Sequence, residues 1–244
     1  MARVDDLVLA ALKTLPAKPD ESAGQAAKRR YSEQMSAALA PALAEELRHR
    51  GMREARPAGP GELGASGAER RLAGGIGAKK VDVSWATEES GLLLGISVKT
   101  ISFRDKATKN FQKNLTNRRA DMLIESVTLH RRFPYAVLAA MLFFDKDARH
   151  DGTARRRSTF ANAFPRLRLF TGRSDPAGRD EQYERFYVLL VDANPFSPSV
   201  QCFHVADQDN EVTLEQMMNE LVELVTERNF DLYEDDGAGG VRKV

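Results

Sequence analysis

The feature that most constrains the fold is an unbroken apolar run at residues 135–144, YAVLAAMLFF. The run is the length of a strand, about half of the ~20 residues that a membrane-spanning helix needs. Since no polar side chains alternate with the apolar ones, both faces of the strand should be buried, which is typical of the interior of a parallel sheet.

A helix is expected directly before this strand. Thr116 or Asn117 can cap it, and it should run to about residue 132, before the break at Pro134. Its predicted buried stripe has the helical spacing i, i+3, i+4, i+7 and consists of Ala120, Leu123, Ile124 and Val127. A strand before the helix and a buried strand after it would form a parallel crossover.

Residues 79–99 supply that preceding strand as part of a β-hairpin. Val81, Val83 and Trp85 alternate with polar residues, residues 87–91 form the turn, and residues 92–99 form the second strand.

The remaining elements follow from the same patterns and lead to a single α/β domain over residues 1–244. We expect helices at 4–15, 24–49, 155–164 and 213–228, and strands at 166–170, 184–191 and an edge strand at 200–205. The core of the domain should span about 28–144 and be decorated by 145–228, while 229–244 is expected to be a flexible tail.

Composition excludes several classes of protein. The chain has 36 Lys and Arg against 35 Asp and Glu, and its hydrophobic content of 42% is that of a globular protein. Cys202 is the only cysteine, which excludes an internal disulfide and a multi-cysteine zinc site, and the four histidines have no metal-ligand spacing. No secretory signal or membrane span is expected, and a cytoplasmic location is the simplest interpretation.

Asp82 lies in the first strand of the hairpin, and Ser97, Val98 and Lys99 lie at the end of the second. A carboxylate and a lysine on neighbouring strands can face one point in space. This pattern, together with the crossover helix and the buried strand, resembles the PD-(D/E)XK nuclease superfamily. The resemblance covers about residues 28–144 and implies a restriction-endonuclease-like fold, with a central mixed β-sheet flanked by helices and with extra C-terminal strands and a helix.

The resemblance also implies roles for individual residues. Asp82 matches the metal-ligating aspartate, Lys99 the catalytic lysine, and Val98 the position whose carbonyl completes the metal shell. Ser97 departs from the pattern, because the family has Asp or Glu there. Either the Ser97 hydroxyl holds a metal-bound water, or another carboxylate takes the place of the missing acid, with Glu69 and Glu46 as the candidates. The implied cofactor is Mg²⁺, for which Mn²⁺ can substitute, since such ions prefer oxygen ligands.

Basic and amide side chains flank this pattern, and as a cluster they favour contact with DNA phosphates. Their alternative role is surface solubility. The cluster consists of Lys79, Lys80, Lys109, Lys113, Asn117, Arg118 and Arg119.

The expected function is a metal-dependent endonuclease that hydrolyses DNA phosphodiester bonds, of a restriction or phage-defence type. Two alternatives stay open: a catalytically inactive DNA-binding subunit on the same fold, and an RNA-cleaving toxin. The expected partner is DNA, with assembly as a homodimer or within a larger defence complex and with no membrane association.

Overall fold

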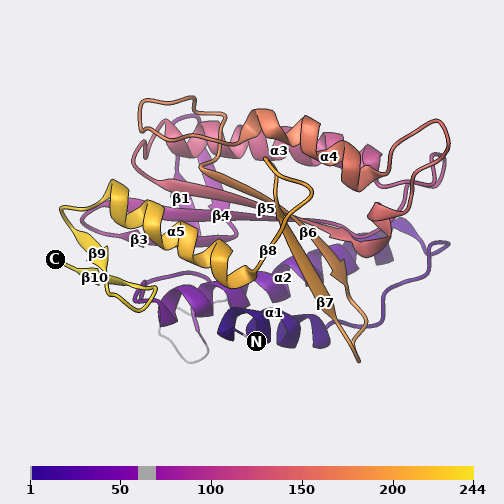
Figure 1. Ribbon diagram of the computed structural model, residues 1–244, viewed down its shortest axis with the longest axis horizontal. Coiled ribbons are helices and arrows are strands. Elements are labelled where there is room, and N and C mark those ends of the chain that lie inside the picture. Colours follow the sequence, from indigo (N-terminus) through magenta and orange to yellow (C-terminus); the bar gives the residue numbers. More distant parts are fainter. Residues whose placement is uncertain (1, 60–69) are drawn as a thin grey trace.

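The computed structural model describes residues 2–59 and 70–244. Its centre is one mixed six-stranded sheet with the strand order β3-β4-β5-β6-β7-β8 (Figure 1). The strands are β3 (Val83–Thr87), β4 (Gly91–Ile101), β5 (Val137–Asp145), β6 (Arg185–Asp192), β7 (Ser199–His204) and β8 (Glu211–Val212). The expected α/β class with a mixed sheet flanked by helices is thus confirmed.

The predicted parallel crossover is present. β4 and β5 pair in parallel from Leu94↔Val137 to Ile101↔Phe144, and α3 (Gln112–His130) connects them. β5 also pairs in parallel with β6, whereas β3 and β7 join their neighbours antiparallel. β5 is therefore enclosed by strands on both sides, and all but its last residue are buried. This explains its unbroken apolar sequence.

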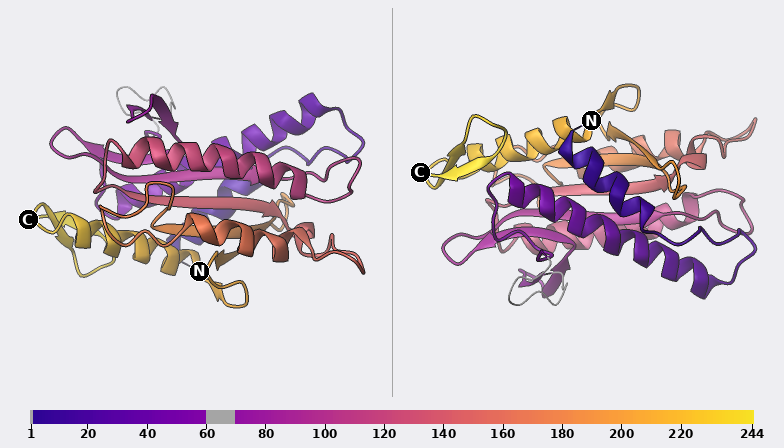
Figure 2. Two further views of the ribbon diagram at one scale, coloured as in Figure 1. Left: turned by 90° about the horizontal axis from the view of Figure 1, so that it is seen from above. Right: turned by 90° about the horizontal axis from the view of Figure 1, so that it is seen from below.

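Helices cover both faces of the sheet. α1 (Arg3–Lys13), α2 (Gln25–His49) and α5 (Leu214–Arg228) lie on one face, and α3 and α4 (Thr159–Leu167) lie on the other (Figures 1 and 2). Each face has its own apolar core, because β4 sends Ile96 and Val98 toward the first set of helices and Leu92 and Ile101 toward the second.

The predicted buried face of α3 is wrong. Ile124 is 53% exposed, and the buried side of the helix carries Met122, Glu125, Ser126 and Leu129 instead. The polar side of the helix faces inward because its polar groups have partners there. The Ser126 hydroxyl donates to the carbonyl of Asp180, and Glu125 pairs with Lys99 of β4. Apolar spacing alone therefore indicated the wrong side.

Three other elements differ from expectation. Residues 168–170 form a 3-10 helix, η2 (Arg168–Phe170), rather than part of a strand, and α4 begins only at Thr159, after the Ser158 cap. β7 is not the edge strand, because β8 pairs with it at Cys202 and Phe203.

Residues 229–244, expected to be a flexible tail, contain a second hairpin. β9 (Tyr233–Asp235) pairs with β10 (Val241–Lys243), and the Tyr233 ring packs edge-on against Trp85 of β3 with centroids 4.8 Å apart. At Gly51, with φ +89°, a Cβ would lie 2.1 Å from the Val241 carbonyl oxygen, so only glycine permits this approach.

Within the described ranges, none of the helices combines the length and apolarity that crossing a membrane would require.

Candidate active site

The candidate site forms where the chain passes from a small sheet to the central one. β1 (Arg70–Ala73) and β2 (Ala78–Val81) make a separate two-stranded sheet, and Asp82 alone separates β2 from β3. The pairing of β3 with β4 begins at Val83↔Ile96. Beyond Ile96, β4 therefore lacks a backbone partner from β3.

The Asp82 side chain occupies that gap. Its Oδ2 accepts a hydrogen bond from the Val98 N–H at 2.6 Å and one from Lys99 Nζ at 2.8 Å. The carboxylate thus replaces a backbone carbonyl, and an N–H that would otherwise be orphaned is satisfied. Because the N–H and C=O of one strand residue point to the same side, the Val98 carbonyl faces this edge as well.

A helix carboxylate completes the cluster from above the sheet. Ser97 and Lys99 share a face of β4, and α3 covers that face. Glu125 of α3 places its Oε2 3.4 Å from Lys99 Nζ. The Lys99 ammonium therefore lies between two carboxylates. The side chains of Asp82 and Lys99 are each 17% exposed, so the site reaches solvent at its edge.

Ser97 is buried beside this cluster. Its hydroxyl completes no hydrogen bond with the part of the chain that the structure describes. It lies beside the Glu125 carboxyl and the Tyr183 hydroxyl, and its proximity partly offsets the rise that burial causes in the pKa of both groups. The Tyr183 hydroxyl itself donates to the Met122 carbonyl of α3 at 2.8 Å, on the buried side of the cluster. A buried polar atom without a partner is uncommon in a folded protein and often marks a place for a ligand or water.

The electrostatics of the cluster follow from burial. Removal from water raises the pKa of Glu125, and Asp82 adds to the effect, while Lys99 and Lys79 oppose it. Burial alone would lower the pKa of Lys99, but the carboxylates of Glu125 and Asp82 outweigh it and raise that pKa. Lys99 is therefore an ammonium at neutral pH.

The two glutamates named from the sequence are not in this cluster as the structure describes it. Glu46 lies in α2, on the other face of the sheet, where Arg3 and Arg50 bind its carboxylate at 2.9 and 2.7 Å. Glu69 lies outside the described residues. The sequence analysis missed Glu125, although a signal existed: Leu115, Met122 and Leu129 are seven residues apart, and Glu125 falls on the same stripe.

The basic residues named from the sequence lie at different distances from the site. Lys79 of β2 acts electrostatically on Glu125, and Lys80 follows it in the same strand. Arg118 is seven residues before Glu125, on the same face of α3 and about 10 Å away along the helix axis.

The other members of the basic cluster lie farther from Glu125 or have protein partners. Lys113 pairs with Asp105 at 3.0 Å, and the Arg119 guanidinium lies over the Phe170 ring. Lys109 precedes α3, and Asn117 is exposed within it, because the helix begins at Gln112. At the start of α3, Asp151 accepts from the Phe111 N–H, so this backbone amide is not available to a phosphate.

No group of three or more His, Cys, Asp or Glu side chains suited to a metal ion occurs among the described residues. The cluster instead offers two carboxylates, a strand carbonyl and an unpaired hydroxyl around one lysine. Comparison with known proteins adds no identity: no family model, curated protein or solved structure matches the chain.

Proposed function

We propose that the chain is a metal-dependent endonuclease that hydrolyses DNA, on a restriction-endonuclease-like variant of the α/β fold. One observation carries the proposal: Asp82, Lys99 and Glu125, which are 43 residues apart at most in the sequence, meet in one contact cluster. The parallel crossover from β4 through α3 to β5, which the pattern of apolar residues predicted and on which the resemblance partly rests, also supports it.

The cluster fits a small divalent cation. Asp82 and Glu125 contact Lys99 Nζ at 2.8 and 3.4 Å, so both carboxylates lie beside the lysine and would hold the ion there, and the Val98 carbonyl faces the same edge. Mg²⁺ needs one or two carboxylates and keeps several waters. The unpaired Ser97 hydroxyl can hold one of those waters. Glu125 would thereby supply from a helix the acid that Ser97 does not supply from the strand.

When bound, Mg²⁺ or Mn²⁺ would supply Lewis-acid activation of the phosphodiester. The chain's own residues contribute position and charge. Lys99 keeps its proton because of the two carboxylates, so it acts as a donor that stabilises the negative charge developing on the phosphate oxygens. Asp82 fixes the ammonium at 2.8 Å and is itself fixed by the Val98 N–H. Lys79 and Arg118 would guide the DNA backbone toward the cluster.

The direct test is cleavage of supercoiled plasmid DNA with Mg²⁺ or Mn²⁺, comparing the wild type with Asp82→Asn, Lys99→Met and Glu125→Gln. We expect each variant to lose at least about 100-fold in rate, as is typical when a donor to a developing oxyanion is removed. Lys28→Met is the matched control, since Lys28 is also buried and paired with a carboxylate, that of Glu21, but lies on α2.

Two outcomes would overturn the assignment. Unchanged cutting by Glu125→Gln would remove the helix carboxylate from the mechanism, and equal losses in Lys28→Met would point to general destabilisation. An RNA substrate run in parallel separates the DNA nuclease from an RNA-cleaving toxin. Sedimentation or light scattering tests the expected homodimer.

A second function, DNA binding without catalysis, is favoured by one observation. Asp82 Oδ2 is already engaged by both the Val98 N–H and Lys99, and a serine stands at the position of the strand acid. In that case calorimetry should show DNA binding with a steep dependence on salt but no Mg²⁺ binding. Cleavage that requires Mg²⁺ would exclude it.

A further inference from the structure

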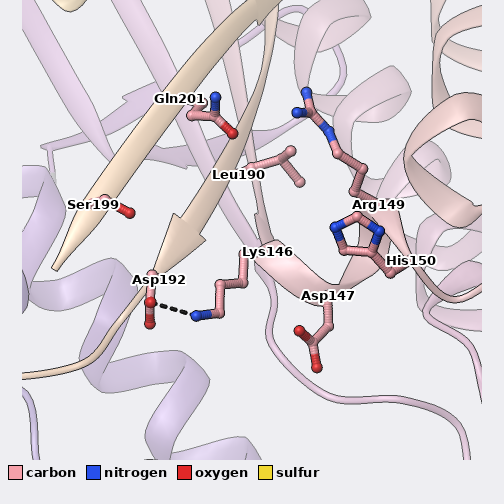
Figure 3. Close-up of a pocket in the computed structure, with 8 residues that line it drawn as sticks. All are labelled: Lys146, Asp147, Arg149, His150, Leu190, Asp192, Ser199 and Gln201. Carbon is pink, nitrogen blue, oxygen red and sulfur yellow. Dashed lines mark hydrogen bonds and ion pairs between the residues drawn. The ribbon is translucent and has the colours of Figure 1, made fainter.

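A separate cavity of about 370 Å³ opens at the carboxyl ends of β5 and β6. Ligands in open α/β sheets commonly bind outside the carboxyl ends of the strands. The volume lies within the range of about 300–1,000 Å³ that is usual for small-molecule sites. Its lining consists of Lys146, Asp147, Arg149, His150, Leu190, Asp192, Ser199 and Gln201 (Figure 3).

Arg149 is the central charge of this cavity. Its guanidinium is held over two aromatic rings, 4.7 Å from the Phe160 centroid and 5.2 Å from the Phe203 centroid. These rings themselves pack edge-to-face at 5.2 Å. Among the described residues, no carboxylate lies within ion-pair distance of Arg149. A rigidly stacked guanidinium without an anionic partner is prepared to bind an anion.

Each of the two carboxylates in the lining already has a cationic partner, Lys146 within the lining for Asp192 and Arg104 outside it for Asp147. Asp192 accepts from Lys146 at 2.5 Å, and Asp147 pairs with Arg104 at 3.1 Å. The charge of Arg149 therefore stays uncompensated within the cavity. Figure 3 shows Arg149 and His150 on one side, with Gln201 and Ser199 across from them and Leu190 between.

We propose that this cavity binds the phosphate group of a small phosphate ester. The guanidinium fork of Arg149 matches two phosphate oxygens, and the adjacent His150 ring is exposed and can donate to a third. Ser199 offers a neutral hydroxyl on the opposite wall, where the Gln201 amide nitrogen already donates to Glu211 at 2.9 Å. Leu190 provides an apolar surface for the organic part of the ester. This site goes beyond the proposed nuclease function.

The cavity is distinct from the cluster of Asp82, Lys99 and Glu125. Lys99 of β4 lies opposite Leu142 of β5, whereas the cavity is built beyond the end of β5 and across β6 and β7. The two sites share no residue. Ligand binding at the cavity and metal-dependent cleavage can therefore be tested separately.

The test is binding of phenyl phosphate to the full chain, measured by ³¹P NMR titration and by thermal shift. Inorganic phosphate and benzoate are the comparison ligands. We expect saturable binding of phenyl phosphate and a rise in melting temperature. Arg149→Gln should weaken the affinity at least about tenfold, since a hydrogen-bonded charge contributes about 1.5–3 kcal/mol. Arg155→Gln, an exposed arginine outside the cavity lining, is the control and should bind as the wild type does.

His150→Ala gives an independent variant if loss of the Arg149 stacking prevents folding, because the His150 side chain is exposed. It should weaken binding about threefold or more. The proposal would be overturned if phenyl phosphate did not bind saturably to the wild type. It would also be overturned if both His150→Ala and Arg149→Gln bound phenyl phosphate as tightly as the wild type does. Equal affinity for benzoate would also overturn it, because the cavity would then recognise any anion. Asp82→Asn should bind phenyl phosphate normally, which separates this site from the nuclease cluster.

Discussion

Lys99 should be the residue on which the stability of the cluster of Asp82, Lys99 and Glu125 depends, more than either carboxylate. Its ammonium lies 2.8 Å from Asp82 and 3.4 Å from Glu125. At an effective dielectric constant of about 20, these pairs attract by about 6 and about 5 kcal/mol. Lys99→Met removes both attractions and leaves two carboxylates facing each other. We expect a net loss of about 3–5 kcal/mol in the free energy of unfolding, which is usual when one partner of a buried pair is removed.

Glu125→Gln should behave in the opposite way. The change removes a charge whose burial raises its pKa, and Lys99 keeps its pair with Asp82. Its stability should therefore lie within about 1 kcal/mol of the wild type, or above it. In the double variant Lys99→Met, Glu125→Gln, the second change should restore about 1–3 kcal/mol of the loss, because the two sites interact.

Urea unfolding at pH 7 gives the free energy of unfolding of the wild type, the two single variants and the double variant. The four values can be compared if the slope of the transition with urea stays constant. Lys28→Met again serves as the control, since Lys28 has one carboxylate partner, Glu21, whose side chain is 46% exposed. A loss below about 1 kcal/mol for Lys99→Met would refute the reasoning. So would a double variant less stable than Lys99→Met alone. Plasmid cleavage should be absent in every variant of the cluster, so that restored stability without restored activity separates folding from chemistry.

Three further outcomes are expected. Gly51→Ala should destabilise the protein by about 2 kcal/mol or more, because its φ is +89° and the new Cβ would meet the Val241 carbonyl; thermal unfolding measures this, with the unhindered Gly77→Ala as control. Burial, with Asp145 and Asp192 nearby, raises the pKa of Tyr31 to about 12, so the folded state keeps a proton that the unfolded chain loses above pH 10. Stability should then fall between pH 10 and 12 by up to about 1.4 kcal/mol per pH unit from this group, and Tyr31→Phe should show a shallower fall in urea titrations. Mg²⁺ at 100 times its Kd should stabilise the wild type by about 2.7 kcal/mol in thermal unfolding, an effect that EDTA reverses and Asp82→Asn lacks.

The sheet could be predicted where side-chain periodicity reports directly on burial. The run at residues 135–144 is apolar because β5 is enclosed on both sides, and the alternation of Val81, Val83 and Trp85 located the strand that pairs with β4. Prediction failed where short segments depend on distant contacts. β9 and β10 have three residues each, and their anchors are isolated positions such as Tyr233, Val241 and the hydrogen bonds to Arg50, which leave no periodic signal.

The candidate site shows the same division. Asp82 and Lys99 could be found because a hairpin brings residues 17 positions apart together through local pairing. Glu125 was missed because the buried side of α3 is partly polar, so that its apolar stripe of Leu115, Met122 and Leu129 is sparse, and the denser stripe with Ile124 that was chosen faces outward. Places where hydrophobic patterning fails are often functional.

The packing of Tyr233 on Trp85 has a consequence for the order of folding. These rings are 148 residues apart in the chain, and such a distant contact forms late, because the loop it closes is long and because synthesis proceeds from the N-terminus. β3 therefore acquires its last neighbours after β4, β5 and β6 have been made. Because Asp82 directly precedes β3, its side chain should be held loosely in the nascent chain until residues 233–241 have been synthesised and have packed against β3. Pulse-labelled hydrogen exchange should show the amide of Trp85 protected later than that of Met141; simultaneous protection would exclude this sequence of events.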